Sequence, residues 1–417
     1  MSVKNALYAQ SGGVTAVINA SAFGIIETAR AHPERIGTVF AAKNGILGAI
    51  HEELIDTKNE TIETLARLKH TPSGAFGSCR YKLKDDGPEM TRLLEVFKAH
   101  HIGYFFYNGG GDSQDTANKI AKMSQAQGAP VICLGVPKTV DNDLPFTDTC
   151  PGFGSVAKYV AISTLEAGFD VASMAASSTK VFILEVMGRH AGWIAASSGL
   201  AGNSQEDPPH LILFPEIRFD ETRFLARVKT CVQRVGYCVI VTSEGLRDQT
   251  GRFLSDSGLR DAFGHAQLGG VAPVLAQLIK QHLNLKYHWA VADYLQRAAR
   301  HIASAVDVDQ AYALGKAAVE LALAGHNAIM PTIVRTNDAP YQWTLGHVPL
   351  ADVANQEKSL PAHFITEDGM GITDACRRYL TPLIQGEAYP PYIQGLPDYV
   401  RLQQTLVSKK LKPFDQS

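Results

Sequence analysis

The sequence lacks the features that mark several large classes of protein. Its six cysteines form no C-x-x-C pair, so a zinc ribbon or a thioredoxin-type site is unsupported, and free thiols in a reducing compartment are expected. No apolar run is long enough to span a bilayer, and residues 1–10 lack the basic start and apolar stretch of a signal peptide. These absences favour a cytoplasmic protein.

A large excess of either positive or negative charge is also lacking. Lys and Arg number 39 against 41 Asp and Glu, a formal net charge of −2. A general attraction to nucleic acid or to an anionic membrane is therefore not expected, and an anionic ligand would have to meet a local cluster of basic groups. The length of 417 residues is too great for one ordinary core and fits two or three α/β lobes.

Apolar runs alternate with helical stretches along the chain. Strands are predicted at 7–10, 38–42, 102–107, 130–136, 179–186 and 237–242, and helices at 15–31, 114–127, 271–283 and 308–324. Because most of the strands are followed by a polar loop and then a helix, we predict an α/β fold. It consists of two doubly wound (Rossmann-like) parallel-sheet lobes with the functional site between them.

Three polar loops follow predicted strands at their carboxyl ends, the edge where open α/β sheets bind ligands. The first is Ser11-Gly12-Gly13, which taken alone favours a tight strand-to-helix turn, with a phosphate-binding turn as the alternative. The second runs from Gly109 to Ser113, and its Asp112 is either a helix N-cap or part of a site. Neither loop has the G-x-G-x-x-G or Walker pattern, which argues against a dinucleotide enzyme or a P-loop kinase.

The third loop is Thr139-Val140-Asp141-Asn142-Asp143, with Lys138 before it. It is either a solvated acidic turn or a functional pair of carboxylates. Two carboxylates in a crevice are costly unless they are used, which favours a general base beside a metal-binding or orienting group.

At these residues the chain resembles the phosphofructokinases. Thr139 to Asp143 is similar to their catalytic T-[IV]-D-N-D motif, and Met187-Gly188-Arg189 to their M-G-R motif. The further matches are the glycine-rich donor loop at 109–113, the donor-side arginine segment Ser78-Cys79-Arg80, Glu244, Gly264-His265 and Tyr294-x-x-Arg297. The matching order runs from Gly13 to Arg297.

The resemblance is greatest to the pyrophosphate-using branch, which carries Asp and Lys where ATP-using members usually carry glycine. This sequence has both residues, Asp112 and Lys138. A carboxylate at the first position would oppose an α-phosphate, and a lysine at the second would compensate the charge of a compact donor. The expected ligands are thus pyrophosphate and fructose 6-phosphate. The alternatives are an ATP-dependent enzyme of the same fold and a non-catalytic, sugar-phosphate-binding regulatory subunit.

The resemblance also implies roles for single residues. Asp141 would take the proton from the sugar hydroxyl, Thr139 would orient that hydroxyl, and Asp143 would support the loop. Cations would neutralise the transferring group or bind the donor; they are Lys138, Arg189 and Arg80. The sugar phosphate would be held by Met187, Gly188, Glu244, His265, Tyr294 and Arg297, and Gly13 would bind substrate from the donor lobe. Lys180 would reach the sugar site of a neighbouring subunit in a homodimer or homotetramer; the alternative is a solvated lysine at the start of a strand. For Tyr294 and Arg297, the alternative is an ordinary helix face near a basic patch.

Two positions depart from the family pattern. The family's metal aspartate falls on Gly111, so the expected Mg²⁺ would be held by pyrophosphate oxygens, water and either Asp112 or Asp141. An arginine common after the family's histidine is Leu268, which weakens the role of His265 and leaves more of the 6-phosphate charge to Arg297.

Three regions are expected from this resemblance. Residues 1–150 would form the donor lobe, which the chain would re-enter at about 267–325. Residues 151–266 would form the sugar-phosphate lobe. The role of residues 326–417 is not indicated by any motif.

Overall fold

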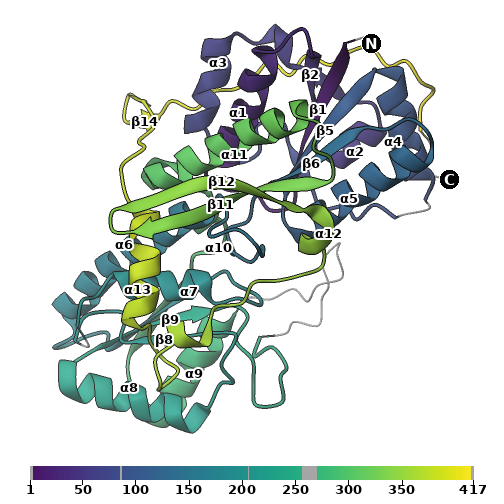
Figure 1. Ribbon diagram of the computed structural model, residues 1–417. Helices are drawn as coiled ribbons and strands as arrows, with labels where there is room; N and C mark the ends of the chain where they lie inside the picture. Colours follow the sequence, from purple (N-terminus) through teal and green to yellow (C-terminus); the bar gives the residue numbers. More distant parts are fainter. Residues whose placement is uncertain (1–2, 85–86, 205, 256–269, 415–417) are drawn as a thin grey trace.

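The computed structural model describes residues 3–84, 87–204, 206–255 and 270–414, and these form two α/β lobes (Figure 1). The first lobe is built on an eight-stranded sheet with the strand order β12-β11-β6-β5-β1-β2-β3, in which β4 pairs with β1. The second is built on a four-stranded sheet with the order β10-β7-β9-β8. The predicted fold class is confirmed, with antiparallel pairing in these two sheets only where β3 and β12 join the edges of the first.

The first lobe places helices on both faces of its sheet. Leu7 and Phe105 point into the core on the side of α4 and α5, whereas Ala6 and Phe106 point into the core on the side of α1 and α11. This alternation on strands buried on both faces is typical of a parallel sheet inside an α/β lobe. The strands are β1 (Lys4–Ser11), β2 (Ile36–Ala42), β3 (Leu54–Asp56), β4 (Ser78–Cys79), β5 (Ile102–Gly109), β6 (Ile132–Pro137), β11 (Ile329–Asp338) and β12 (Tyr341–Pro349). The helices are α1 (Ile18–Arg30), α2 (Ile46–Ile50), α3 (Ile62–Ala66), α4 (Pro88–Ala99), α5 (Gly111–Ala126), α11 (Ala305–Leu323) and α12 (Leu350–Val353).

The second lobe repeats this arrangement with four parallel strands. One face of its sheet packs on α6, α7 and α13, and the other packs on α8 and α9. Its strands are β7 (Val181–Val186), β8 (Leu211–Leu213), β9 (Cys238–Ser243) and β10 (Tyr287–Val291). Its helices are α6 (Phe153–Met174), α7 (Trp193–Ser197), α8 (Glu221–Val235), α9 (Val271–Leu283), α10 (Asp293–Ala298) and α13 (Asp374–Leu380). In the described part of the chain, no helix is both long and apolar enough to cross a membrane.

The chain returns to the first lobe later than the predicted residue 267. The helix predicted at 271–283 forms as α9, but it packs in the core of the second lobe, and β10 then pairs with β7. The sheet to which a strand belongs is decided by the strand that it pairs with. Because β10 is an edge strand with four exposed residues of five, its own hydrophobic pattern does not predict which lobe it joins. The return runs through α10 to α11, which packs on α1.

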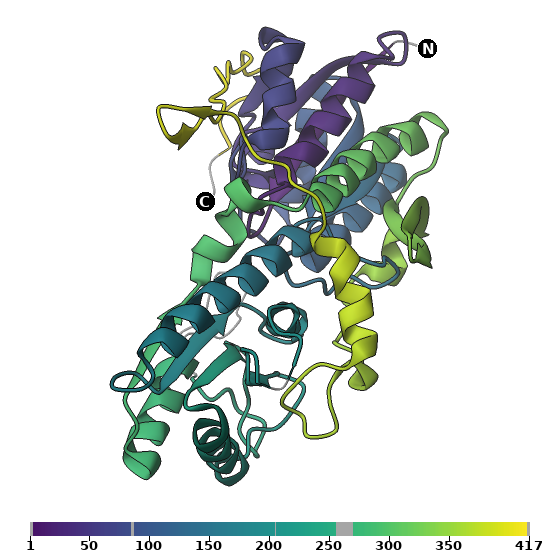
Figure 2. The same ribbon diagram turned by 90° about the vertical axis from the view of Figure 1, so that its left-hand side faces the viewer.

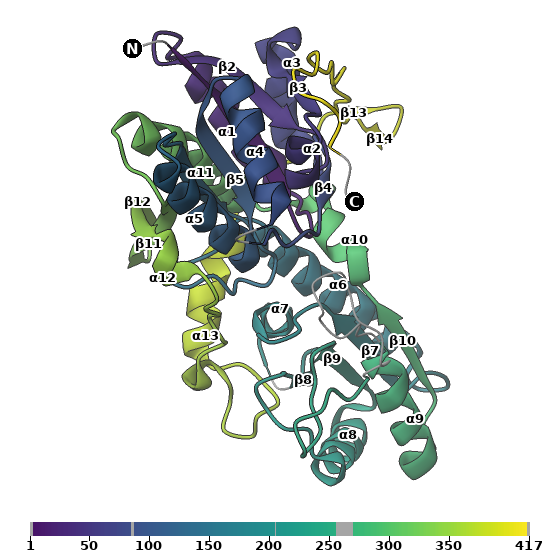
Figure 3. The ribbon, with the colours of Figure 1, turned by 90° about the vertical axis from the view of Figure 1, so that its right-hand side faces the viewer.

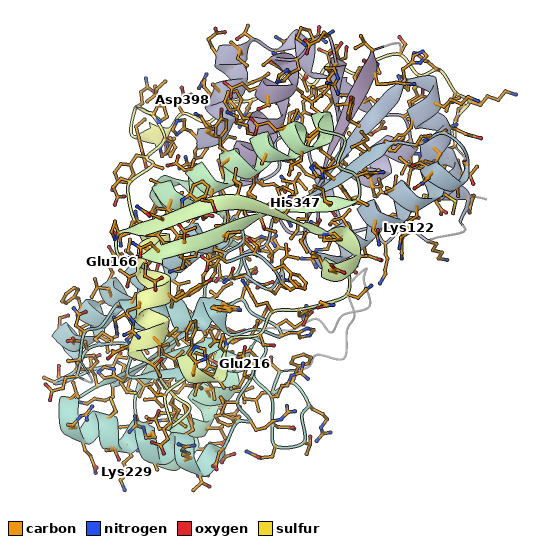
Figure 4. All side chains as sticks on the ribbon, in the orientation of Figure 1. Lys122, Glu166, Glu216, Lys229, His347 and Asp398 are labelled. Atoms are coloured by element: carbon orange, nitrogen blue, oxygen red, sulfur yellow. The ribbon has the colours of Figure 1, made fainter. Side chains whose placement is uncertain are left out.

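The C-terminal segment contacts both lobes. Its strands β11 and β12 extend the first sheet, and α13 packs on the second lobe. The chain then runs back over the first lobe, where Asp398 (Figure 4) forms an ion pair with Arg67 at 2.6 Å. Further along, the Asp56 N–H donates a 2.9 Å hydrogen bond to the Thr405 carbonyl. Although it carries no motif, the described part of this segment, residues 326–414, therefore connects the two lobes through its contacts (Figure 2).

Helix α6 is fixed at its start by a carboxylate from α11. Gly152, with φ 109°, precedes the helix, and its N–H and that of Ser155 each donate a 2.9 Å hydrogen bond to the buried Asp307. A carboxylate at a helix N-terminus satisfies orphan N–H groups and complements the helix dipole. Since Gly152 also bridges Thr139, this cap anchors the loop that follows β6.

Candidate active site

A cavity of about 640 Å³ lies between the lobes, lined by residues of both. Loops after β1, β5 and β6 line it from the first lobe, and turns after β7 and β9 line it from the second, as expected for the carboxyl ends of parallel strands. Most of the predicted site residues meet there: Gly13, Arg80, Gly111, Asp112, Lys138, Thr139, Asp141, Asp143, Met187, Arg189, Glu244, Tyr294 and Arg297.

The loop after β1 supports a group of cations. A Cβ on Gly13 would lie 2.7 Å from Nη1 of Arg297, so only glycine lets the guanidinium rest against the backbone there. Arg80 approaches the same point, and the Lys138 ammonium donates a 2.6 Å hydrogen bond to the Gly13 carbonyl. Tyr294 covers Arg297, with the guanidinium carbon 3.9 Å from the ring centroid. Three cations around a glycine turn form an anion-binding surface.

Asp112 lies in the first turn of α5 and is not its N-cap. The N-cap is Gly110, and no side chain caps the helix. The Asp112 carboxylate is instead 3.6 Å from the Lys82 ammonium, at the cavity surface. A Cβ on Gly111 would meet no atom within 4 Å, so the space beside Asp112 is open. The N-cap interpretation of Asp112 is therefore wrong, and its role in a site stays a prediction.

Lys138 is buried among groups of both signs. Burial lowers the pKa of its ammonium to about 8, helped by the neighbouring Arg297 and opposed by Asp143 and Asp141. A lysine with this pKa changes its charge near neutral pH and is suited to a site of proton or phosphoryl transfer.

Asp141 is the most strongly perturbed carboxylate of the cavity. Burial raises its pKa to about 8, and the negative charges of Asp143 and Glu244 act in the same direction. Its Oδ1 is buried and has no hydrogen-bond partner among the described residues, while the Asp141 N–H donates to the Thr139 hydroxyl at 3.1 Å. An unpartnered carboxylate oxygen with a raised pKa is equipped to accept a proton from a bound hydroxyl.

The second lobe contributes a cation and another carboxylate. Burial raises the pKa of Glu244, and the nearby Arg189 opposes this shift. Gly188 does not line the cavity, but it has φ 129° and a Cβ there would lie 2.7 Å from the Ala191 carbonyl. Its role in the structure is thus to allow the turn that presents Met187 and Arg189.

Two predicted residues are not brought to the cavity. Lys180 lies before β7, at the opposite end of the strand, and donates a hydrogen bond to the Ala175 carbonyl. His265 lies outside the described residues. His190 and Glu357 also line the cavity but were not predicted from the sequence; the imidazole Nδ1 and the carboxylate Oε2 are 3.0 Å apart. His190 directly follows the M-G-R motif, whereas nothing in the sequence around Glu357 signals a site.

The arrangement combines a proton acceptor with positive charge on both sides of an open cavity. Asp141 stands between the cation group at Gly13 and Arg189 of the opposite lobe. Such a site suits transfer of a highly charged group to a hydroxyl, where positioning and charge stabilisation dominate catalysis.

Known proteins share this fold and much of this sequence. A family model described as phosphofructokinase matches residues 5–322. A protein of Halomonas elongata named pyrophosphate–fructose 6-phosphate 1-phosphotransferase is 64% identical over 417 residues, covering 99% of this chain and 100% of that protein. A protein of the same name from Methylococcus capsulatus is 64% identical over 414 residues, covering 99% of each. The crystal structure of a pyrophosphate-dependent phosphofructokinase from Marinobacter aquaeolei matches with a TM-score of 0.92 and 61% identity over 100% of both chains.

Proposed function

The chain belongs to the phosphofructokinase family, and we propose that it reversibly transfers a phosphoryl group from pyrophosphate to the 1-hydroxyl of fructose 6-phosphate, giving fructose 1,6-bisphosphate and phosphate. The observation that carries the proposal is the presence of Asp112 and Lys138 in one cavity with Asp141, whose buried Oδ1 has no hydrogen-bond partner among the described residues. The printed names of the similar proteins support the same donor and acceptor.

The acceptor reaction is assigned to the loop after β6. Asp141 takes the proton of the sugar 1-hydroxyl as the phosphoryl group arrives, and Thr139 orients that hydroxyl. Lys138 and Arg189 stabilise the charge on the transferring group from opposite lobes. Glu244 and Met187 hold the sugar, and the 6-phosphate is assigned to Tyr294 and Arg297. The family resemblance adds His265, which lies outside the described residues.

The donor is assigned to the loops after β1 and β5, with Arg80 and Lys138 as its cations. The Mg²⁺ that phosphofructokinases use fits here: Asp112 offers carboxylate oxygens, the ligand type Mg²⁺ prefers, beside open space at Gly111. Asp112 would hold the ion together with pyrophosphate oxygens and water, and Gly111 offers no side chain. When bound, the ion neutralises phosphoryl charge.

A direct assay tests the proposal. Purified protein is incubated with fructose 6-phosphate and Mg²⁺, and fructose 1,6-bisphosphate is measured with pyrophosphate or ATP as donor. Product with pyrophosphate and little or none with ATP is expected. Product with neither donor would exclude the activity.

The rate should depend on pH through two groups that titrate in opposite senses. Asp141, with its pKa raised to about 8, must be ionised, and Lys138, with its pKa lowered to about 8, must be protonated. We therefore expect kcat/KM to rise toward about pH 8 and to fall above it. Lys138→Arg should lose the fall at high pH, because a guanidinium stays charged. A profile that is flat from about pH 6.5 to 9.5 would contradict both assignments.

We propose that a homodimer forms through the side of the molecule that carries α6, β10 and α10 (Figure 3). Large apolar side chains are exposed there, among them Phe169, Trp289 and Leu295. Lys180 lies beside the start of the edge strand β10, since its N–H donates a 2.9 Å hydrogen bond to the Lys286 carbonyl. About 20 Å of strand separates Lys180 from its own cavity, so a role at a sugar site would require a neighbouring subunit.

Mixed subunits test this role of Lys180. We expect light scattering to give at least a dimer, and Lys180→Ala to lower activity. Subunits with Lys180→Ala mixed with subunits inactivated by Asp141→Asn should regain part of the activity, because one of the mixed sites is then intact. A fully active monomer would contradict the assembly, whereas a dimer without regained activity would contradict the role of Lys180 alone.

A further inference from the structure

A short strap of the C-terminal segment, residues 357–360, lies between the two halves of the active site. Its Lys358 N–H donates a 2.7 Å hydrogen bond to the Asp143 carbonyl in the loop after β6. The Lys358 carbonyl accepts a 3.0 Å bond from the indole of Trp193, just after the M-G-R turn. At its end, the N–H of Leu360 and that of Gly192 donate to the same oxygen of Glu216, at 3.0 and 2.8 Å (Figure 4). The strap is thus bonded to the loop of one lobe and the turn of the other.

The Lys358 side chain joins parts of the loop that are apart in sequence. Its ammonium donates to the carbonyls of Thr147 and Asp148, at 3.0 Å each, and lies 3.4 Å from Oδ1 of Asn142. An ammonium has three N–H donors, and here each has an acceptor in residues 142–148. The lysine therefore closes this stretch of chain from the side away from the cavity.

Asn142 is the residue that this closure holds in place. It is buried and has φ 53°, a left-handed conformation that costs free energy in a residue with a Cβ. Besides Lys358, its amide oxygen accepts a 3.0 Å bond from the Cys150 N–H, and its amide nitrogen donates at 3.1 Å to the Tyr379 hydroxyl. With Asn142 held this way, its neighbours Asp141 and Asp143 line the cavity.

A second brace from the same segment supports the far end of the loop. Arg335 of β11 donates to both carboxylate oxygens of Asp148, at 3.0 and 3.1 Å, and to the Tyr379 carbonyl at 3.0 Å. The Tyr379 hydroxyl in turn donates to the Asp148 carbonyl. Every one of these braces comes from residues 326–417 and none enters the cavity, so they act on the shape of the loop.

We propose that Lys358 is a positioning residue for phosphoryl transfer, which holds residues 139–150 in the conformation that presents the Asp141 carboxylate to the sugar hydroxyl. This rests on the proposed function, because the consequence is expressed in that reaction. Small displacements of a catalytic group cost much rate, since the reacting atoms must already be aligned. The effect should therefore appear in the chemical step and little in substrate binding.

Lys358→Met tests the proposal, with Lys158→Met as the matched control. Lys158 is also buried and also anchors the C-terminal segment, through the Gly386 carbonyl at 2.7 Å and Glu387 at 2.9 Å, but it does not contact the loop. Lys358→Met should lower kcat by about 10- to 100-fold and change both KM values by less than about threefold. Lys358→Arg should recover much of kcat, and Lys158→Met should keep it.

Amide hydrogen exchange followed by mass spectrometry adds a readout that needs no activity. Exchange in residues 139–150 should be faster in Lys358→Met and unchanged in Lys158→Met. If Lys358→Met does not fold, Tyr379→Phe, which removes one hydroxyl from the same network, should show a smaller change in the same direction. Equal losses of kcat in both lysine variants, a raised KM with normal kcat, or normal exchange in the loop would each overturn the proposal. An inactive wild type would instead contradict the proposed function, and the exchange comparison would then still show whether Lys358 holds residues 139–150 in place.

Discussion

Asp141→Asn is expected to lower kcat by about 10²–10⁴, the range for loss of general base catalysis. The amide keeps the size of the side chain but cannot accept the hydroxyl proton. KM for fructose 6-phosphate should change much less, because the carboxylate acts mainly in the transition state. Steady-state kinetics with pyrophosphate as donor measure both constants, and a variant that keeps near-normal kcat would show that another group is the base.

The stability of the same variant should change in the opposite direction. The folded-state pKa of Asp141 lies above its unfolded value, because burial and the neighbouring carboxylates disfavour the ionised form. Ionisation therefore opposes folding, and this destabilisation is absent below about pH 4 and grows as pH rises to about 8. Asp141→Asn removes it, so we expect the variant to unfold at a higher temperature than the wild type at pH 8 and at a similar one near pH 4. A lower unfolding temperature at pH 8 would indicate that the kinetic loss comes from a damaged fold.

The residues that the sequence analysis grouped lie together because one rule of α/β sheets places them. Loops that follow parallel strands share an edge, so Gly13, Asp112 and Lys138 could be expected to meet from the sequence alone. The same rule predicts that the turns after β7 and β9 meet at the corresponding edge of the second sheet. Local pattern was sufficient for these strands because each is buried on both faces and reads as an apolar run.

Features that depend on distant contacts could not be predicted in this way. The edge strand β10 is mostly exposed, and its pairing with β7 decides its lobe. Glu357 lines the cavity and Lys358 supports the loop after β6, but both come from a segment with no repeated pattern, so no motif predicts their roles. Burial raises the pKa of Asp141, and so does the charge of Glu244 from the other lobe, which has no signature in the loop itself.

Donor choice should change when Asp112 is replaced. The wild type should use pyrophosphate and show little reaction with ATP, because a carboxylate in the donor region repels the further phosphate of a nucleotide. Asp112→Gly should permit weak ATP turnover while pyrophosphate turnover falls. Asp112→Asn separates charge from volume: if repulsion dominates, it should admit ATP as Asp112→Gly does, and if volume dominates, it should not. Asp115→Asn is the control, because Asp115 lies on the same helix, pairs with Lys119 at 2.8 Å and is outside the cavity.

Lys138→Gly should act on the other donor, by removing the cation that serves the compact pyrophosphate and its leaving phosphate. A charge-assisted contact of this kind contributes about 1.5–3 kcal/mol, so a fall of about ten- to a hundredfold in kcat/KM with pyrophosphate is expected. Lys138 and Asp112 line one cavity, so their effects need not add, and the double variant measures how strongly they are coupled. The measurement is kcat/KM for both donors in the wild type, each single variant and the double variant. Equal wild-type turnover with ATP and pyrophosphate would overturn the donor assignment, and it would leave the family and the role of Asp141 intact, because neither depends on which phosphate leaves.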